Sequence, residues 1–159
     1  MGNASSANND LIEAIKDKSK AAVENALKAG AEINAITEGR TALHVAVYAD
    51  LVEMATLLLD AGADPNAAVE GGTPLHDAAE RGNDACVELL LAKGVPVDQL
   101  NAESGHTPLM WAALAGRVAV LRRLLASGAD RSLKNNANKT ALDLATEYGK
   151  KDAIAVLTA

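Results

Sequence analysis

The chain has 159 residues, of which 49% are apolar and 23% charged, a size and composition typical of one folded, water-soluble domain. It contains 34 Ala and 21 Leu but no Phe, and its aromatic residues are Tyr48, Trp111 and Tyr148. This composition favours closely packed helices and argues against a β-sandwich or barrel, whose strands prefer β-branched and aromatic residues. The net charge of −6 argues against general nucleic-acid binding, which needs clustered Lys and Arg.

No apolar run approaches the roughly 20 residues that cross a bilayer, and residues 1–6 contain neither a basic nor an apolar segment. We therefore expect neither secretion nor a membrane span. Cys86, the single cysteine, lies in an apolar stretch and has no partner for an internal disulfide. It is expected to be a buried, unreactive thiol in a reducing compartment, either the cytoplasm or the nucleus.

The amino terminus, residues 1–9, is small and polar and predicts a flexible tail. Its first residues also match the N-myristoylation pattern, with Gly2 behind Met1 and Ser6 at the required place. Two interpretations remain, an ordinary disordered leader and a lipidated glycine. Because one acyl chain binds only weakly and no polybasic segment follows, membrane association is expected only with lipidation of Gly2, and then reversibly.

The rest of the chain is organised by an internal repeat. Four segments align on a leading threonine, and their threonines are 32, 34 and 33 residues apart: Thr41–Ala46, Thr73–Ala78, Thr107–Ala112 and Thr140–Ala145. A second marker around a glycine keeps the same period: Ala29–Asn34, Ala61–Asn66, Lys93–Asp98 and Ser127–Ser132. Chance agreement of two markers at one period is very improbable.

Each repeat predicts two short helices followed by an extended turn. The threonine is suited to cap the first helix, and Pro74 and Pro108 are suited to its first position. About eight residues later, a residue with left-handed backbone conformation is expected to end the first helix. Glycine suits this position and is present at Gly82, Gly116 and Gly149; Asp50 and Lys18 occupy the same position less favourably. A more apolar second helix comes next, such as residues 52–61. Neither helix is stable alone, so each unit must pack against its neighbours.

These residues resemble the ankyrin repeat, whose Thr-Pro-Leu-His-x-Ala signature stands in full at Thr73–Ala78 and whose period is 33 residues. The resemblance covers nearly everything from Asp10 onward. It implies an all-α solenoid of stacked helix-turn-helix units with connecting β-turn or hairpin loops. We expect a domain over residues 10–159 with five repeats, at about 10–35 (a cap), 36–67, 68–101, 102–134 and 135–159 (a cap).

No set of residues predicts an enzyme, a metal site or a cofactor. His44 and His76 occupy the fourth signature position, where the resemblance implies hydrogen bonds that tie turns and repeats together. Packed helices lie about 8–10 Å apart, too far for equivalent histidines to share a zinc ion. Carboxylates such as Asp77 and Glu80 are expected to be solvated, and no phosphate loop or nucleophile motif is present.

The resemblance implies protein binding on a concave face built from the turn tips and the outward side of the first helices. The candidate binding residues share these positions and are Arg40, Tyr48, Glu80, Arg81, His106, Trp111, Leu114 and Tyr148. We expect His106 to be exposed in its turn. Trp111, Leu114, Tyr48 and Arg81 are predicted to form the centre of the site, because interface energy concentrates in Trp, Tyr and Arg.

The third repeat is chemically unusual. Met110 replaces the histidine of the signature, and with Leu109 and Leu114 it is expected to form an exposed apolar patch. For Trp111 two roles remain open, half-buried packing and an exposed anchor for a partner.

The predicted function is a monomeric, non-catalytic protein-interaction module; the alternative is an N-myristoylated adaptor that recruits a partner reversibly to membranes. Residues 1–100 carry 7 basic and 16 acidic side chains, whereas residues 101–159 carry 8 basic and 5 acidic ones. This imbalance favours a partner with a basic segment, or it serves solubility alone.

Overall fold

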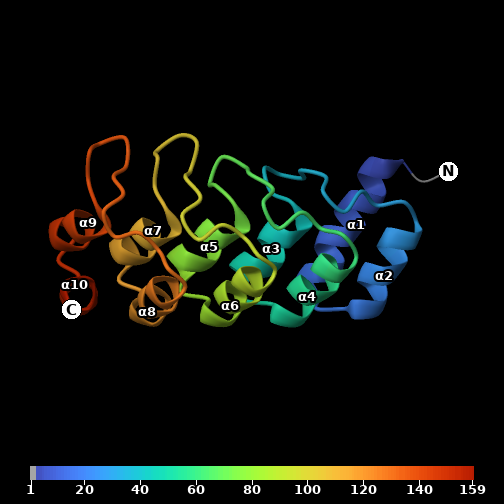
Figure 1. Cartoon of the computed structure of the whole chain (residues 1–159). Coiled ribbons are helices and arrows are strands. Elements are labelled where there is room, and N and C mark those ends of the chain that lie inside the picture. Colours follow the sequence, from blue (N-terminus) through green and yellow to red (C-terminus); the bar gives the residue numbers. More distant parts are fainter. Residues whose placement is uncertain (1–2) are drawn as a thin grey trace.

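A computed structural model describes residues 3–159, which fold into ten helices arranged as five stacked pairs (Figure 1). The predicted lipidation site, Gly2, lies outside the described residues. The helices have the following bounds: α1 Ala4–Lys16, α2 Lys20–Lys28, α3 Ala42–Tyr48, α4 Val52–Asp60, α5 Pro74–Arg81, α6 Asp84–Ala92, α7 Pro108–Ala115, α8 Val118–Ala126, α9 Ala141–Glu147 and α10 Lys151–Thr158.

The stack has three layers, which run side by side along its length in Figure 1. The first helix of each pair (α1, α3, α5, α7, α9) forms one row, and the second helix (α2, α4, α6, α8, α10) forms another. Long loops precede α3, α5, α7 and α9 and project beyond the row of first helices. We call the face made by these loops and the first helices the turn-side surface. The all-α solenoid predicted from the repeat is confirmed.

The turns are hairpin-like, as expected. Thr37 and Arg40 form an antiparallel bridge in which each amide donates to the other's carbonyl, at N–O distances of 2.8 and 3.1 Å. Val69 and Gly72 form the equivalent bridge in the next turn.

Local sequence sets the ends of the first helices. Thr41, Thr73, Thr107 and Thr140 all occupy N-cap positions with extended backbone. Thr107 Oγ1, for example, accepts a hydrogen bond from the Met110 amide at 3.2 Å, which satisfies one of the free amides at the helix start. The predicted stops are also confirmed: Gly82 has a φ of 80°, and Asp50 takes the same left-handed region with a φ of 56°.

The core explains the Ala-rich composition. Ala46, Ala78, Ala112 and Ala145 are fully buried at equivalent positions of successive first helices. Small side chains there let helices of neighbouring repeats approach closely. The second helices contribute larger groups at equivalent positions, the buried Leu58, Leu90 and Leu124.

The first helix starts earlier than predicted. We expected residues 1–9 to form a flexible tail, but α1 begins at Ala4, so this prediction is wrong for residues 4–9. Ala7 is buried and extends the apolar side of the helix by one turn, and Asn3 caps it. The Asn8 side chain also accepts a hydrogen bond from the Glu32 amide at 2.7 Å, which ties this first part of α1 to the segment after α2.

Cys86 is fully buried, as predicted. Burial raises the pKa of its thiol to about 12, and the nearby Asp50 carboxylate raises it further. The thiol is therefore protonated at neutral pH and unreactive. Among residues 3–159, no helix has the length and apolarity that crossing a membrane requires.

Candidate protein-binding surface

Two buried histidines hold the turns of neighbouring repeats together. His44 Nε2 lies 3.1 Å from the Gly72 carbonyl oxygen, and His76 Nε2 lies 3.1 Å from the His106 carbonyl oxygen. Because a carbonyl only accepts, Nε2 carries the proton, and Nδ1 of each ring accepts from the threonine at its own N-cap. Burial lowers the pKa of both imidazoles, in agreement with neutral rings. The structural role expected for these histidines is confirmed.

Three candidate residues from two repeats meet on the turn-side surface. The guanidinium carbon of Arg40, in the turn before α3, lies 4.1 Å from the centre of the Tyr48 ring. The guanidinium carbon of Arg81, at the end of α5, lies 4.6 Å from the same centre. Tyr48 is half-buried, and Arg81 is exposed. We call these residues the Arg40–Tyr48–Arg81 cluster; the aromatic face attracts both cations.

Asp77 lies beside this cluster and is a feature that the sequence analysis misjudged. We expected its carboxylate to be solvated, but its side chain is only 8% exposed, and Oδ2 has no hydrogen-bond partner among the described residues. Arg40 Nη1 is 3.7 Å from Oδ2, an ion-pair distance too long for a hydrogen bond. Burial raises the pKa of the Asp77 carboxyl to about 6, although the Arg40 charge acts in the opposite direction.

His106 and Trp111 form a second pair, with ring centroids 5.0 Å apart. The expectation that His106 is exposed is wrong: it is half-buried, burial lowers its pKa, and its Nδ1 is buried without a partner in the described chain. Trp111 is also half-buried against the core, and its indole Nε1 is shielded and unpaired there. Packing is therefore one role of Trp111, while part of its ring remains accessible.

The apolar patch predicted for the third repeat is not present. Leu109 and Met110 are each only 1% exposed, because both point into the repeat stack. Met110 Sδ lies 3.4 Å from the Thr107 amide nitrogen and accepts the hydrogen bond that His76 Nδ1 accepts from the Thr73 amide in the preceding repeat. Leu114 is half-buried and packs on the core.

The remaining candidates lie apart from one another. Glu80 has an exposed side chain, and its backbone carbonyl accepts from Arg117 Nε at 2.9 Å. Tyr148 follows α9 at the carboxyl end of the stack and is 55% exposed. The structure thus brings together Arg40, Tyr48 and Arg81, and separately His106 and Trp111.

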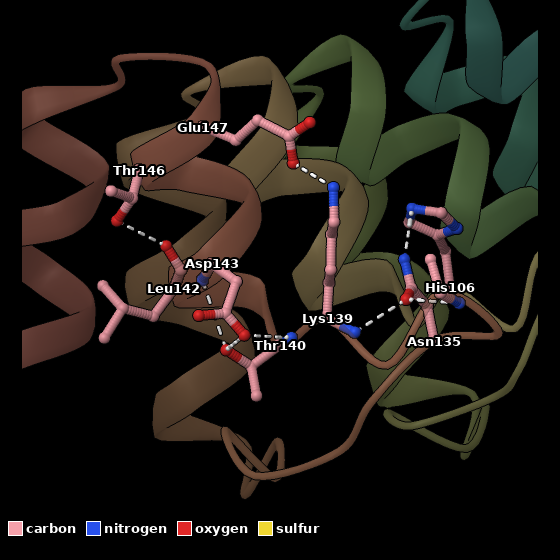
Figure 2. Close-up of polar contacts among 9 residues, drawn as sticks. His106, Asn135, Lys139, Thr140, Leu142, Asp143, Thr146 and Glu147 are labelled. Atoms are coloured by element: carbon pink, nitrogen blue, oxygen red, sulfur yellow. Dashed lines mark hydrogen bonds and ion pairs between the residues drawn. The ribbon is translucent and has the colours of Figure 1, made fainter.

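The last turn is held by a polar network that the sequence analysis did not identify (Figure 2). Asn135 Oδ1 accepts hydrogen bonds from the amides of Ala137 and Lys139, each at 3.0 Å, and its Nδ2 lies 3.2 Å from His106 Nε2. From the same turn, the Lys139 side chain reaches Glu147 in α9 and forms an ion pair with it. Asparagines between a glycine and the next threonine were the available signal for such a turn.

The comparisons with known proteins agree with this architecture. A model of the family described as ankyrin repeats (3 copies) matches residues 11–101 and 75–159. The chain belongs to the ankyrin-repeat family.

Among similar proteins, an ankyrin repeat-containing protein of Treponema pallidum is 39% identical over 79 residues, covering 50% of this chain and 26% of that protein. Ankyrin repeat family A protein 2 of Homo sapiens is 37% identical over 90 residues, covering 43% of this chain and 29% of that protein. The human NAD-capped RNA hydrolase NUDT12 is 35% identical over 74 residues, which are 46% of this chain and 16% of the hydrolase. The matches thus span less than a third of each of these relatives.

Proposed function

We propose that this chain is a non-catalytic protein-interaction module that holds a protein partner on its turn-side surface. Ankyrin repeats are in general protein-interaction modules. The observation that carries the proposal is the meeting of Arg40, Tyr48 and Arg81, which come from two repeats and remain partly accessible. Tyr and Arg are among the residues that contribute most to binding energy at interfaces.

Rigidity of the turns supports the same proposal. His44 and His76 tie the turns before α5 and α7 to the preceding repeat through hydrogen bonds from their buried rings. A surface that is already ordered loses little conformational entropy when a partner binds. The proposed site includes all eight candidates, with Trp111 and Leu114 supporting the surface from below and Tyr148 at its carboxyl end.

The partner and compartment belong to the proposal as well. The acidic balance of residues 1–100 supports a partner with a basic segment, which opposite potentials would steer toward this half of the chain. The protonated, buried Cys86 fits a monomer acting in the cytoplasm or nucleus.

The test is affinity capture with the full chain and variants at exposed positions. Arg81→Ala and Tyr148→Ala together are expected to weaken capture of a specific partner at least about tenfold, the effect of one interface hot spot. Arg122→Ala, at an exposed arginine in α8 on the far row of helices, is the matched control and should leave capture unchanged. Equal capture by the double variant and the wild type would contradict the proposal.

Trp111 needs a gentler substitution than alanine. Because it is half-buried, Trp111→Ala would remove packing and lower stability by a few kcal/mol as well as any contact with a partner. Trp111→Phe keeps an aromatic ring in the core and removes only the outer part of the indole, so it separates binding from folding.

A second candidate function rests on Gly2 and Ser6, whose spacing fits an N-myristoylated adaptor. Coexpression with the acyltransferase followed by intact-mass measurement tests it. A mass increase of one myristoyl group, absent in Gly2→Ala, is expected of an adaptor; an unchanged mass would remove this candidate.

A further inference from the structure

We infer that the Arg40–Tyr48–Arg81 cluster is a docking site for a short acidic segment of the protein partner. This inference rests on the proposed protein-binding function and specifies the chemistry of one part of the surface.

Equivalent positions in two repeats give their cation different partners. Arg40 directly precedes the leading threonine of its repeat, and Tyr48 lies seven residues after that threonine. In the last repeat the same two positions hold Lys139 and Glu147, which form an ion pair. The cation of the last repeat is thus neutralised within its own repeat, whereas Arg40 faces an uncharged ring.

Positive charge is left unmatched at the cluster. Arg81 brings a second cation to the same ring, although two like charges repel each other. Among the described residues, Arg81 has no ion-pair partner, and its side chain donates no hydrogen bond. Arg40 has only the Asp77 carboxylate, at 3.7 Å. Two guanidinium groups therefore face one partly matched carboxylate.

The chemistry of guanidinium groups identifies the ligand. A guanidinium carries five N–H donors in one plane, and contact with an aromatic face leaves these donors available to carboxylates. Arg40 has a side chain 38% exposed, and Arg81 is exposed, so an incoming chain can reach both. Carboxylates accept such hydrogen bonds in pairs and strengthen them through opposite charge. An Asp- or Glu-rich segment fits this arrangement, whereas a Lys-rich one is repelled by it.

The cluster is positively charged, whereas the surrounding residues 1–100 carry a net negative charge. Residues 1–100 carry more than twice as many acidic as basic side chains, and Glu80 lies next to Arg81 in α5. Long-range attraction is therefore not what brings an acidic segment here. Its binding must come from direct contact with Arg40 and Arg81, and specific substitutions will reveal it.

The experiment is an NMR titration of the full chain that follows the Nε–Hε signals of its arginines. The probe is a capped hexaglutamate peptide, with hexaglutamine and hexalysine at the same ionic strength for comparison. We expect saturable shifts at Arg40 and Arg81 with hexaglutamate, no saturation at the exposed Arg122, and no comparable shifts with the other two peptides.

Variants test whether the two arginines act together. Arg81→Gln should weaken hexaglutamate binding measured at Arg40 by about fivefold, as expected for loss of a charge-assisted hydrogen bond at an accessible site. Arg81→Lys should weaken it less, because the charge remains and only the planar donor set is lost. Arg122→Gln is the matched control and should have no effect. Circular dichroism melting of each variant verifies the fold.

Two results would overturn the inference: shifts at Arg40 and Arg81 no larger than those at Arg122, or equal binding by the wild type and Arg81→Gln. Its failure is distinct from failure of the proposed function. If a partner is captured through the turn-side surface while hexaglutamate fails to bind, only the acidic segment is rejected.

Discussion

The turns before α5 and α7 and the last turn are held by different chemistry. In the amino-terminal half, imidazoles of His44 and His76 reach across to the next turn and occupy buried positions. In the last turn, the Asn135 side chain accepts hydrogen bonds from two amides of the same loop, and Lys139 forms an ion pair with Glu147 (Figure 2). The last turn therefore satisfies its own polar groups, whereas the earlier half leaves Arg40, Arg81 and Asp77 incompletely matched. Equivalent parts of the repeat thus differ in how far their charged groups are matched within the chain.

The largest expected effect tests the histidine linkage of the amino-terminal half. Gly72 has a φ of 109°, and a Cβ there would lie 2.9 Å from the His76 ring. Gly72→Ala should lower the free energy of unfolding by about 3 kcal/mol, because it adds steric conflict to an unfavourable backbone conformation. Gly62, with a φ of 98° and no atom near its Cβ position, is the matched control. Gly62→Ala should cost about 1 kcal/mol, measured by urea denaturation; equal losses would show that the ring is not tightly held.

The next effect tests the asparagine network at the other end. Asn135→Ala removes the acceptor for two amides and the side-chain contact to His106, so it should cost about 2 kcal/mol. Asn136→Ala, which loses one exposed hydrogen bond to the Glu103 carbonyl, should cost about 0.5 kcal/mol. If the two variants melt at the same temperature, the last turn is not held as described.

Asp77 gives a smaller and pH-dependent effect. Its folded-state pKa of about 6 exceeds the ordinary value of 3.8, so the folded chain binds this proton more tightly than the unfolded chain does. The contribution of Asp77 to stability is therefore greatest below about pH 4, is lost as the pH rises to about 6, and stays constant above that. Asp77→Val, which copies Val45 at the equivalent position, should be more stable than the wild type by about 1–2 kcal/mol at pH 7.5.

Denaturation of both proteins at several pH values checks this prediction. The stability difference between variant and wild type should grow between pH 4 and pH 6. A difference independent of pH would mean that the carboxyl is not desolvated.

The smallest change in stability is expected when Arg40 is given a carboxylate partner like that of Lys139. Tyr48→Glu gives Arg40 the type of partner that Lys139 has in Glu147, and should lower stability by about 1 kcal/mol, because the half-buried ring and its two cation–π contacts are lost and an accessible ion pair restores little. Hexaglutamate affinity should nevertheless fall several-fold, because the cluster becomes neutralised. Thr146→Glu, at an exposed position in α9, adds the same charge elsewhere and serves as the control. Unchanged hexaglutamate affinity in Tyr48→Glu would contradict the proposed difference between the unmatched Arg40 and the neutralised Lys139.

The repeat made most of the fold predictable, because capping threonines and left-handed stops act within a few residues. The helix pairs and the turns between them followed from these signals, whereas the roles of His44 and His76 were expected from the resemblance to the ankyrin repeat. The start of α1 did not, since the helix depends on the burial of Ala7 and on a bond from Asn8 to a segment distant in sequence.

The candidate site was predictable only in part. The sequence grouped Tyr48 and Arg81 with Trp111 and Leu114, whereas in the structure Arg40 joins them, because these contacts depend on side chains from neighbouring repeats. The same dependence explains the errors at Asp77, His106 and Met110, whose burial is decided by the adjacent repeat rather than by their own sequence. Positions that are equivalent by repeat, such as Val45, Asp77 and Trp111, have different surroundings for this reason.

Hydrogen–deuterium exchange of the chain with its captured partner tests the central claim most directly. If the turn-side surface holds the partner, amide exchange should slow in the turns at 36–41, 68–73 and 101–107 and at the end of α5, while α4, α6 and α8 remain unchanged. Protection confined to the second helices, with unaltered exchange in those turns, would contradict the account.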